Sequence, residues 1–158
     1  MADDIATAVI YDVEEPPAMI RNVRAEDVWP IRHEVMWPEK DFDFIKLPGD
    51  EGDLTRHFGL YVGDRLVSVL SLFKQDEGKT AQFRKFATLT ELQKRGLGSA
   101  LLSHAIDEAR DSGVKKFWCH ARAEQSSFYS NFGLQQTGEH FEREGQSYVN
   151  MEMQLSTS

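Results

Sequence analysis

The feature that most constrains the fold is the stretch from Lys85 to Leu102, which reads KFATLTELQKRGLGSALL. It begins as an extended apolar run, passes through a polar turn, and continues through two glycines into a strongly helical segment. The first N–H groups of a helix have no intrahelical acceptor, and the helix macrodipole adds positive charge there. A strand that leads through such a loop into a helix therefore favours an anion site at the helix N-terminus.

The residues at the start of this helix indicate which anion would bind. Gly96 and Gly98 lack the side chains that would keep a phosphate from the backbone, and Lys94 and Arg95 add positive charge. The spacing matches neither the Gly-x-Gly-x-x-Gly signature of dinucleotide sites nor the Gly-Lys-Ser/Thr signature of nucleoside triphosphate sites. The loop predicts a cradle for a diphosphate, although a tight strand-to-helix turn without a ligand would contain the same glycines.

Length and composition bound the organisation of the chain. Its 158 residues suffice for one domain with a sizeable core. The acidic segment 1–17 ends in Pro16-Pro17 and is interpreted as an N-terminal extension, in which Thr7–Tyr11 either adds one strand or stays irregular. Residues 18–158 are expected to form the single domain.

Charge, cysteine content and hydropathy argue against several classes of function. The formal net charge of −8 argues against a nucleic-acid partner, which requires a basic face. Cys119 is the only cysteine, so neither a disulfide framework nor a Cys-x-x-Cys metal site is available. No apolar run is long enough to cross a membrane, and no signal-peptide pattern begins the chain. A cytoplasmic protein without a membrane partner is expected.

Hydrophobic patterning predicts an α+β domain, with a single mixed and mostly antiparallel sheet and helices on both faces. The expected strands are Met19–Val23, Phe58–Val62, Arg65–Phe73, Thr80–Leu89, Val114–Ala121, Leu134–Phe141 and Tyr148–Leu155. The expected helices are Asp27–Trp37, Gly96–Ser112 and Glu124–Asn131, with Asp27 capping the first. The segment Lys40–Thr55 is expected to be a loop or a broken helix, and Gly63-Asp64 predicts a hairpin turn.

A second motif follows the predicted crossover. Residues Ser127–Leu134 read SFYSNFGL, an aromatic pair on a short helix followed by a glycine and an apolar strand. Aromatic residues at helical spacing are most often core residues, so packing alone would explain this element.

Taken together, the glycine loop and the aromatic element resemble the GNAT superfamily of N-acetyltransferases. That family has a Gln/Arg-x-x-Gly-x-Gly/Ala signature, followed by a Phe-Tyr-x-x-x-Gly-Phe element. The matching positions are Gln93, Arg95, Gly96, Leu97, Gly98 and Ser99 for the first, and Phe128, Tyr129 and Gly133 for the second. Leu134 replaces the last Phe, and the family's frequent Asn upstream of this element is absent. The resemblance covers Ile20–Leu155.

This resemblance implies a GNAT-type fold and acetyl-CoA as co-substrate. Residues Gln93–Ser99, Lys94 included, would bind the pyrophosphate of coenzyme A. A backbone N–H among Phe86, Ala87 and Thr88 would polarise the thioester carbonyl, and Tyr129 would protonate the departing thiolate. Because the amine attacks the thioester directly, proximity and orientation would supply much of the rate.

A narrower resemblance concerns the glyphosate N-acetyltransferase branch. The segments that carry it are Ile31-Arg32-His33, Trp37-Pro38, His57-Phe58-Gly59, Ala87-Thr88-Leu89 and Trp118-Cys119-His120-Ala121-Arg122. The branch implies that Arg84 and Arg122 bind an anionic substrate, with Trp37 and His120 beside them. Trp37 stands where the branch has a third arginine, and Tyr148 stands where it has a histidine that deprotonates the amine. Surface ion pairs would be the other explanation of the two arginines.

Tyr148 leaves the general base open, because a tyrosine with a pKa near 10 is a poor base at neutral pH compared with a histidine near 6.5. A water chain, another group, or an amine that arrives neutral would serve instead. His57, His120 and His140 are further candidates, each of which is otherwise a solvated or hydrogen-bonded histidine. His33-Glu34 is not followed by a second histidine at helical spacing, so no metal site is expected.

The sequence therefore predicts an N-acetyltransferase that moves the acetyl group of acetyl-CoA to the primary or secondary amine of a small, amino-acid-like and anionic molecule. A non-catalytic acyl-CoA sensor is the first alternative, because the expected base is missing. A protein-lysine acetyltransferase is the second; the acidic charge suits a basic peptide, whereas Arg84 and Arg122 oppose one. The identity of the amine and the oligomeric state, a homodimer included, are left open.

Overall fold

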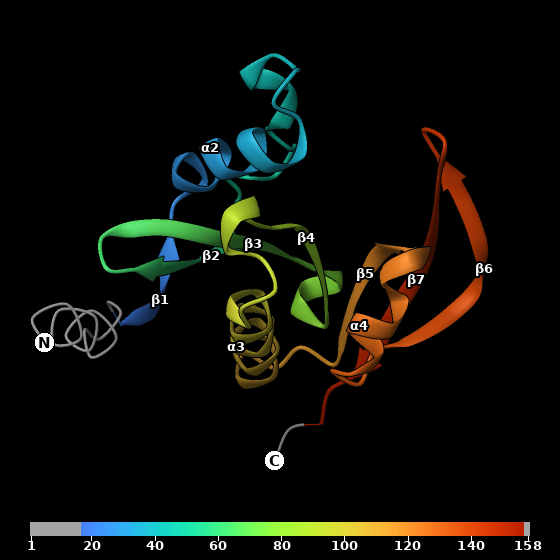
Figure 1. Ribbon diagram of the computed structural model, residues 1–158. Coiled ribbons are helices and arrows are strands. Elements are labelled where there is room, and N and C mark those ends of the chain that lie inside the picture. The colour runs from blue at the N-terminus through green and yellow to red at the C-terminus, as the bar shows by residue number, and fades with distance from the viewer. Residues whose placement is uncertain (1–16, 157–158) are drawn as a thin grey trace, which may run out of the picture.

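The computed structural model describes residues 17–156 (Figure 1), so the predicted strand at Thr7–Tyr11 lies outside the described residues. The described strands are β1 (Ala18–Val23), β2 (Thr55–Val62), β3 (Arg65–Gln75), β4 (Thr80–Thr88), β5 (Lys116–Arg122), β6 (Gln135–Arg143) and β7 (Gln146–Gln154). The α-helices are α2 (Ala25–Met36), α3 (Leu97–Asp111) and α4 (Ser126–Ser130). Short 3-10 turns are η1 (Phe42–Ile45), η2 (Asp76–Gly78), η3 (Thr90–Leu92) and η4 (Ala123–Gln125).

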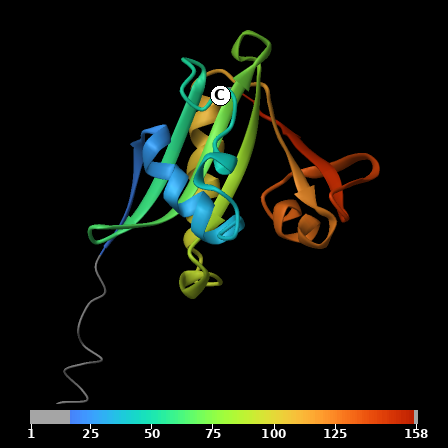
Figure 2. The same ribbon diagram turned by 90° about the horizontal axis from the view of Figure 1, so that it is seen from above.

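The strands form one sheet in the order β1-β2-β3-β4-β5-β7-β6. Every neighbouring pair is antiparallel except β4 and β5, which are parallel because α3 connects them as a crossover. This confirms the predicted mixed and mostly antiparallel sheet. β4 and β5 pair only along Thr80–Gln82 and Lys116–Trp118, and beyond these residues the two strands diverge (Figure 2).

Helices cover both faces of the sheet, as predicted: α2 and α3 lie on opposite sides of it (Figures 1 and 2). The buried residues of α3 recur at helical spacing, so one stripe of the helix packs on the sheet. They are Leu101, Leu102, Ala105, Ile106 and Ala109. Within residues 17–156, no helix combines the length and the apolar character needed to cross a membrane.

The first helix starts earlier than its predicted cap. Arg24 is the N-cap of α2, and Asp27 lies inside the first turn, where its carboxylate accepts the Arg24 N–H at 2.9 Å. An acidic residue satisfies the free N–H groups of a helix from this position as well as from the cap, so the residue type alone did not fix the start. As a result, Pro30 lies in the helix interior instead of the first turn.

The last hairpin is longer than predicted. Its turn consists of Glu144 and Gly145 alone, both with positive φ (52° and 79°), and pairing begins at once with Arg143 and Gln146. A two-residue turn with positive φ at both positions matches the twist of the strands, so the polar residues next to it stay in the ladder. The hairpin of β6 and β7 consequently extends Arg143 to its tip.

A bulge interrupts the pairing of β3 with β4. Val69 pairs with Ala87 and Ser71 pairs with Arg84, so β4 has one residue more than β3 in this interval. Lys85 lies in the bulge with a φ of 54°, in the left-handed region that residues other than glycine rarely adopt. The bulge changes which side chains of β4 face each side of the sheet at the point where β5 has already diverged.

Candidate active site

The backbone of β4 is unpaired on the side that faces the gap beside β5. Leu89 directly follows β4, and its N–H donates to the Val67 carbonyl of β3 at 2.9 Å, so this N–H points away from the gap. Because successive N–H groups of a regular strand alternate between its two sides, the N–H group of Thr88 points into the gap, whereas Phe86 lies in the bulge, where this alternation is interrupted. An extended ligand with amide groups would find a hydrogen-bond donor here.

The helix that follows β4 offers donors at the end of the gap. Gly96 is the N-cap of α3 and has a φ of 83°, and Lys94 also has positive φ at 65°. Among the residues that the structure describes, the N–H groups of residues 94–99 find no acceptor. A cluster of free N–H groups at a helix N-terminus, with Lys94 and Arg95 exposed beside it, fits a diphosphate.

Gly98 and Gln93 also hold the loop against β4. A Cβ on Gly98 would lie 3.1 Å from the Phe86 ring and 3.4 Å from Thr88 Oγ1, so this glycine lets α3 approach β4 closely. The Gln93 amide donates to the Thr88 carbonyl at 2.9 Å and ties the loop to the end of the strand. Gly96 is the glycine whose missing side chain leaves the mouth of the loop open.

Tyr129 lies on α4, at one side of the gap. Its ring packs against Phe83 of β4 at 5.7 Å and against Phe128 at 5.1 Å, and only 9% of the residue is exposed. Burial, and then the neighbouring Cys119, raise the pKa of Tyr129 far above its usual range, so the hydroxyl keeps its proton at neutral pH. No described residue forms a hydrogen bond with that hydroxyl, so it is available as a donor.

The opposite face of β4 presents two cations. The Lys85 ammonium lies 4.3 Å from the centre of the Trp37 ring, and the Arg84 guanidinium lies 5.8 Å from that of Phe73. Neither side chain forms an ion pair or a hydrogen bond with any residue in the described range 17–156. Burial, and then the charge of Arg84, lower the pKa of Lys85 to about 8.

A third cation reaches this area from the tip of the β6–β7 hairpin. The Arg143 guanidinium lies over the Phe141 and Tyr148 rings, at 5.5 and 5.3 Å, and those two rings are stacked. Burial, and then the charge of Arg143, lower the pKa of Arg84, so Arg143 lies near enough for its charge to act on Arg84. Arg84, Lys85 and Arg143 are called the basic patch below.

Arg122 and Tyr148 are paired across β5 and β7 on the same side as His120. Arg122 is exposed, and its Nη1 lies 4.0 Å from Glu124 Oε1, a distance at which a surface ion pair contributes little. The structure thus brings Trp37 and Arg84 to the basic patch and leaves Arg122 at the end of β5. Lys85 and Arg143 were missed in the sequence, since no motif marks a bulge or the length of a hairpin.

His57 is buried and uses both ring nitrogens. Nε2 lies 2.7 Å from the Asp50 carbonyl oxygen and must therefore carry the proton, while Nδ1 accepts from Ser71 Oγ at 2.6 Å. Burial lowers the pKa of His57, and the charge of nearby Arg32 acts in the same direction. Its lone pair is occupied, and it belongs to an internal network.

His120 and His140 lie at the surface. Arg143 donates to His120 Nδ1 at 3.2 Å, which occupies the lone pair of that ring, and burial followed by the charge of Arg143 lowers the pKa of His120. The Nδ1 atom of His140 lies 3.4 Å from Ser147 Oγ on the same hairpin.

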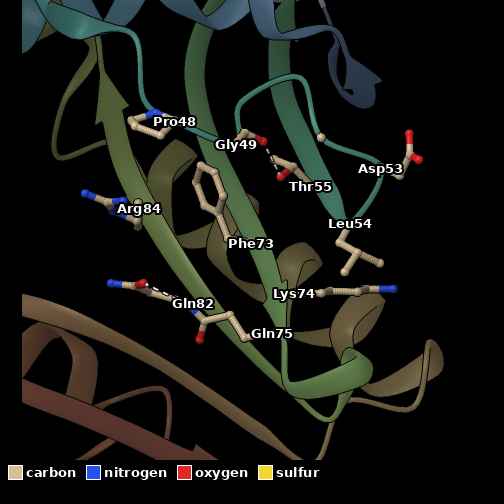
Figure 3. A pocket seen from close by; sticks show the side chains of 11 residues that line it. Pro48, Gly49, Asp53, Leu54, Thr55, Phe73, Lys74, Gln75, Gln82 and Arg84 are labelled. Carbon is tan, nitrogen blue, oxygen red and sulfur yellow. Dashed lines mark hydrogen bonds between the residues drawn. The ribbon is translucent and has the colours of Figure 1, made fainter.

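A pocket adjoins Arg84 on this face of the sheet (Figure 3). It has a volume of about 410 Å³, and the Phe73 ring lies between Gly49 and Arg84. Gln82 and Gln75 from β4 and β3 line its polar side, and their amides are 3.4 Å apart. Its remaining lining residues are Pro48, Gly52, Asp53, Leu54, Thr55 and Lys74.

The pocket wall is held in place by a buried ion pair. Arg32 of α2 is fully buried and donates to both carboxylate oxygens of Asp50, at 2.7 and 3.0 Å, and to the Ile45 carbonyl and Ser71 Oγ. The Trp29 indole N–H donates to the same carboxylate at 2.9 Å. These bonds fix the loop that follows η1 against α2 and β3.

The chain is similar to known proteins over most of its length. The family model described as "Acetyltransferase (GNAT) domain" matches residues 51–155. The chain is 28% identical over 131 residues to the uncharacterized N-acetyltransferase YitI of Bacillus subtilis, covering 80% of this chain and 88% of that protein. It is 30% identical over 106 residues to the [ribosomal protein bS18]-alanine N-acetyltransferase of Salmonella typhimurium, covering 65% and 66%. The crystal structure of Escherichia coli ElaA superimposes with a TM-score of 0.73 at 20% identity, covering 86% of this chain and 99% of that one.

Proposed function

The chain belongs to the GNAT family and is an acyl-CoA-dependent acetyltransferase, and on this premise we propose that it acetylates the primary or secondary amine of a small anionic molecule, with acetyl-CoA as the donor. The acceptor is expected to be amino-acid-like, with a carboxylate or phosphonate near its amine. A cytoplasmic location remains a prediction from the sequence.

The observation that carries the proposal is the basic patch. Arg84 lies beside the gap without an acidic partner among the described residues, and the charge of Arg143 on the hairpin adds to the burial that destabilises its charged form. A half-buried cation of this kind is stabilised when an anion binds beside it. A charge-assisted hydrogen bond to a carboxylate typically contributes ~1.5–3 kcal/mol, so the patch favours an anionic acceptor over its neutral amide. The narrower resemblance to the glyphosate N-acetyltransferase branch supports the same class.

The donor fits the opposite side of the gap. The free N–H groups of residues 94–99 would hold the diphosphate, and the N–H groups of Phe86 and Thr88 would bind the extended arm and the thioester carbonyl. The Tyr129 hydroxyl would donate a hydrogen bond to sulfur. Because its pKa is raised, this hydroxyl stabilises the developing thiolate as a donor without losing its proton outright.

The pocket beside Arg84 supports an acceptor with a side chain. Its mixed lining of the Phe73 ring with the Gln75 and Gln82 amides suits a chain that is partly apolar and ends in a polar group. The Salmonella relative is named for the alanine of a ribosomal protein, which makes a peptide N-terminus the competing acceptor. The cations of the patch disfavour a basic peptide in that place.

The experiment that tests the proposal has two parts. Isothermal titration calorimetry with acetyl-CoA should show binding that weakens in Arg95→Gln, whereas Arg110→Gln, at the other end of α3 and paired with Asp107, should bind as the wild type does. Acetyl-CoA-dependent thiol release is then measured with amino acids, aminophosphonates, polyamines and peptides. Absence of binding at millimolar acetyl-CoA, or turnover restricted to cationic amines, would contradict the proposal.

A further inference from the structure

Of the three candidate histidines, His57 and His120 have their lone pairs occupied by hydrogen bonds, and His140 lies at the surface beside Ser147 of its own hairpin. Tyr148 is stacked under Arg143 and against Phe141. The proton acceptor must therefore be another titratable group beside the gap.

Lys85 has the position that a proton acceptor needs. It lies in the β4 bulge, directly before Phe86, in the part of β4 that β5 no longer pairs. Phe83 and Phe86, on either side of it in sequence, pack toward the aromatic rings of α4. Lys85 itself contacts Trp37 on the other face. An acceptor amine that approaches from the face of α2 would meet Lys85 while the sulfur lies on the side of Tyr129.

The strained backbone supports a specific role for this residue. A φ of 54° in a strand is unfavourable for a lysine and common for a glycine, and the bulge turns its side chain toward the Trp37 side together with Arg84. Left-handed residues other than glycine cluster at functional sites, where the surrounding structure maintains them.

We propose that Lys85 is the general base of the transfer, and that it accepts the proton which the acceptor's amine loses as it attacks. This inference rests on the proposed function of the site. The amine nitrogen uses its lone pair to form the bond to the acetyl carbon, and one N–H proton passes to Lys85 Nζ. The bond between carbon and sulfur breaks with its electron pair going to sulfur, which leaves as a thiolate. Lys85 then releases its proton to water and the thiolate takes one from water, so that an amide and a thiol result.

The charges around Lys85 make its neutral form accessible. Arg84 on β4, Arg32 on α2 and Arg143 on the hairpin all repel its ammonium, while Glu144 at the hairpin tip is the one acidic side chain that acts in the opposite direction. Burial is the largest cause, and together with these charges it brings the pKa of Lys85 to about 8, so about a tenth of the side chains are neutral at pH 7 and about half at pH 8. A base with a pKa in this range is partly deprotonated at neutral pH and still binds a proton strongly enough to remove it from the attacking amine.

The test compares Lys85→Gln with Lys85→Arg. Arginine keeps a positive charge at this position but cannot be deprotonated, so it separates a base from a residue that contributes only charge. Both variants are expected to lower kcat by ~10²-fold or more, while Lys85→Arg keeps the acceptor KM near the wild-type value. In the wild type, kcat should rise toward pH 8, and the midpoint of this rise should be the same for acceptors whose amines differ in basicity. The rise should disappear in both variants. Lys46→Gln, which also removes a lysine lying over a tryptophan ring, is the matched control and should leave kcat unchanged.

A second readout does not depend on turnover. Competitive labelling with acetic anhydride, followed by mass spectrometry of the peptide, should give Lys85 in the wild-type protein a titration midpoint near pH 8. A midpoint near that of a free lysine, ~10.4, would overturn the inference even if both variants failed to fold. Lys85→Arg with the kcat and pH profile of the wild type would overturn it as well. If no amine is acetylated by the wild type, the proposed function fails instead, and calorimetry with acetyl-CoA distinguishes the two cases.

Discussion

Tyr129 illustrates how a single hydroxyl can be prepared by its surroundings. Its ring is packed between Phe83 and Phe128, while its hydroxyl has no partner among the described residues. Burial ensures that the group donates a hydrogen bond at any physiological pH. The sequence predicted this residue because the family motif names it, whereas the loss of solvent around it depends on tertiary packing.

Tyr129→Phe removes only the hydroxyl and keeps the ring. We expect kcat to fall by ~10²-fold or more, because positioned donation to the leaving group is made in the transition state. The calorimetric Kd for acetyl-CoA and the melting temperature should stay near the wild-type values. Tyr148→Phe, on the hairpin, is the control and should cost little; equal losses in the two variants would contradict the role of Tyr129.

A second residue-scale prediction separates the two arginines named in the sequence. Arg84→Gln should raise the KM for an anionic acceptor by roughly tenfold or more, since a charge-assisted contact is lost. Arg122→Gln should have a smaller effect, because this side chain is exposed and lies beside Glu124. The measurement is KM for an acceptor and for its neutral amide with each variant. A larger effect of Arg122→Gln than of Arg84→Gln would show that Arg122 is the main contact of the anionic group.

At the scale of elements, the loop that follows η1 depends on the buried pair of Arg32 and Asp50. We expect Asp50→Ala to lower the free energy of unfolding by ~3–5 kcal/mol, because it leaves the Arg32 guanidinium buried without its partner. Urea unfolding measures the change. Asp43→Ala, on η1 and exposed, is the control and should have little effect. Similar changes in both variants would show that the pair does not anchor the loop.

The same network predicts how stability depends on acidity. Burial lowers the pKa of folded His57, so the unfolded state binds a proton more readily, and its contribution is lost as the pH falls below ~6.5. Burial alone would raise the pKa of Asp50, but hydrogen bonds from Arg32, Leu47 and Trp29 lower it overall, so its contribution is lost only below ~3.9. Between pH 7 and 5, His57→Gln should show a shallower decline in the urea midpoint than the wild type, and the exposed His140→Gln should not. Equal declines in all three proteins would contradict this account.

Elements were predicted well where a periodic pattern sets them. The predicted helix Gly96–Ser112 matches α3 to within one residue at each end, since burial of one helix face leaves an apolar repeat in the sequence. The β4 bulge was not predicted, because a bulge is a mismatch between two strands and neither Lys85 nor its neighbours carry a sign of it. The basic patch depends on that bulge and on the hairpin tip, and for this reason only Arg84 among its members was anticipated.

On the scale of the whole molecule, the short pairing of β4 with β5 divides the sheet into two groups of strands. The crossover order and the closing hairpin were predictable from the alternation of strands and helices. How far β5 runs beside β4 was not, because both strands alternate buried apolar and more polar residues along their lengths, and this pattern carries no mark of where the pairing ends. The candidate site lies where that divergence begins.

We expect acetyl-CoA to protect this region from hydrogen exchange. Binding to the folded state alone slows the exchange of the sites it covers, by up to ~100-fold at a ligand concentration 100 times Kd. Amides of Phe86 and Thr88 should therefore slow more than those of β1, which lies at the far end of the sheet. Hydrogen–deuterium exchange with mass spectrometry of peptides from β4 and β1 provides the comparison. Equal slowing in both peptides would mean that the ligand is not bound in the gap.

The unpaired backbone of β4 also bears on solubility. Strands with free N–H and C=O groups are templates for aggregation, and proteins usually protect them with charges, proline or a covering segment. Here the protection is partial: the cations of Arg84 and Lys85 flank the strand on one face, and its open side is left for a ligand. A bound donor would complete the sheet in the manner of an added strand. The supply of coenzyme would thus influence how much of this protein stays soluble in a cell, independently of its catalytic rate.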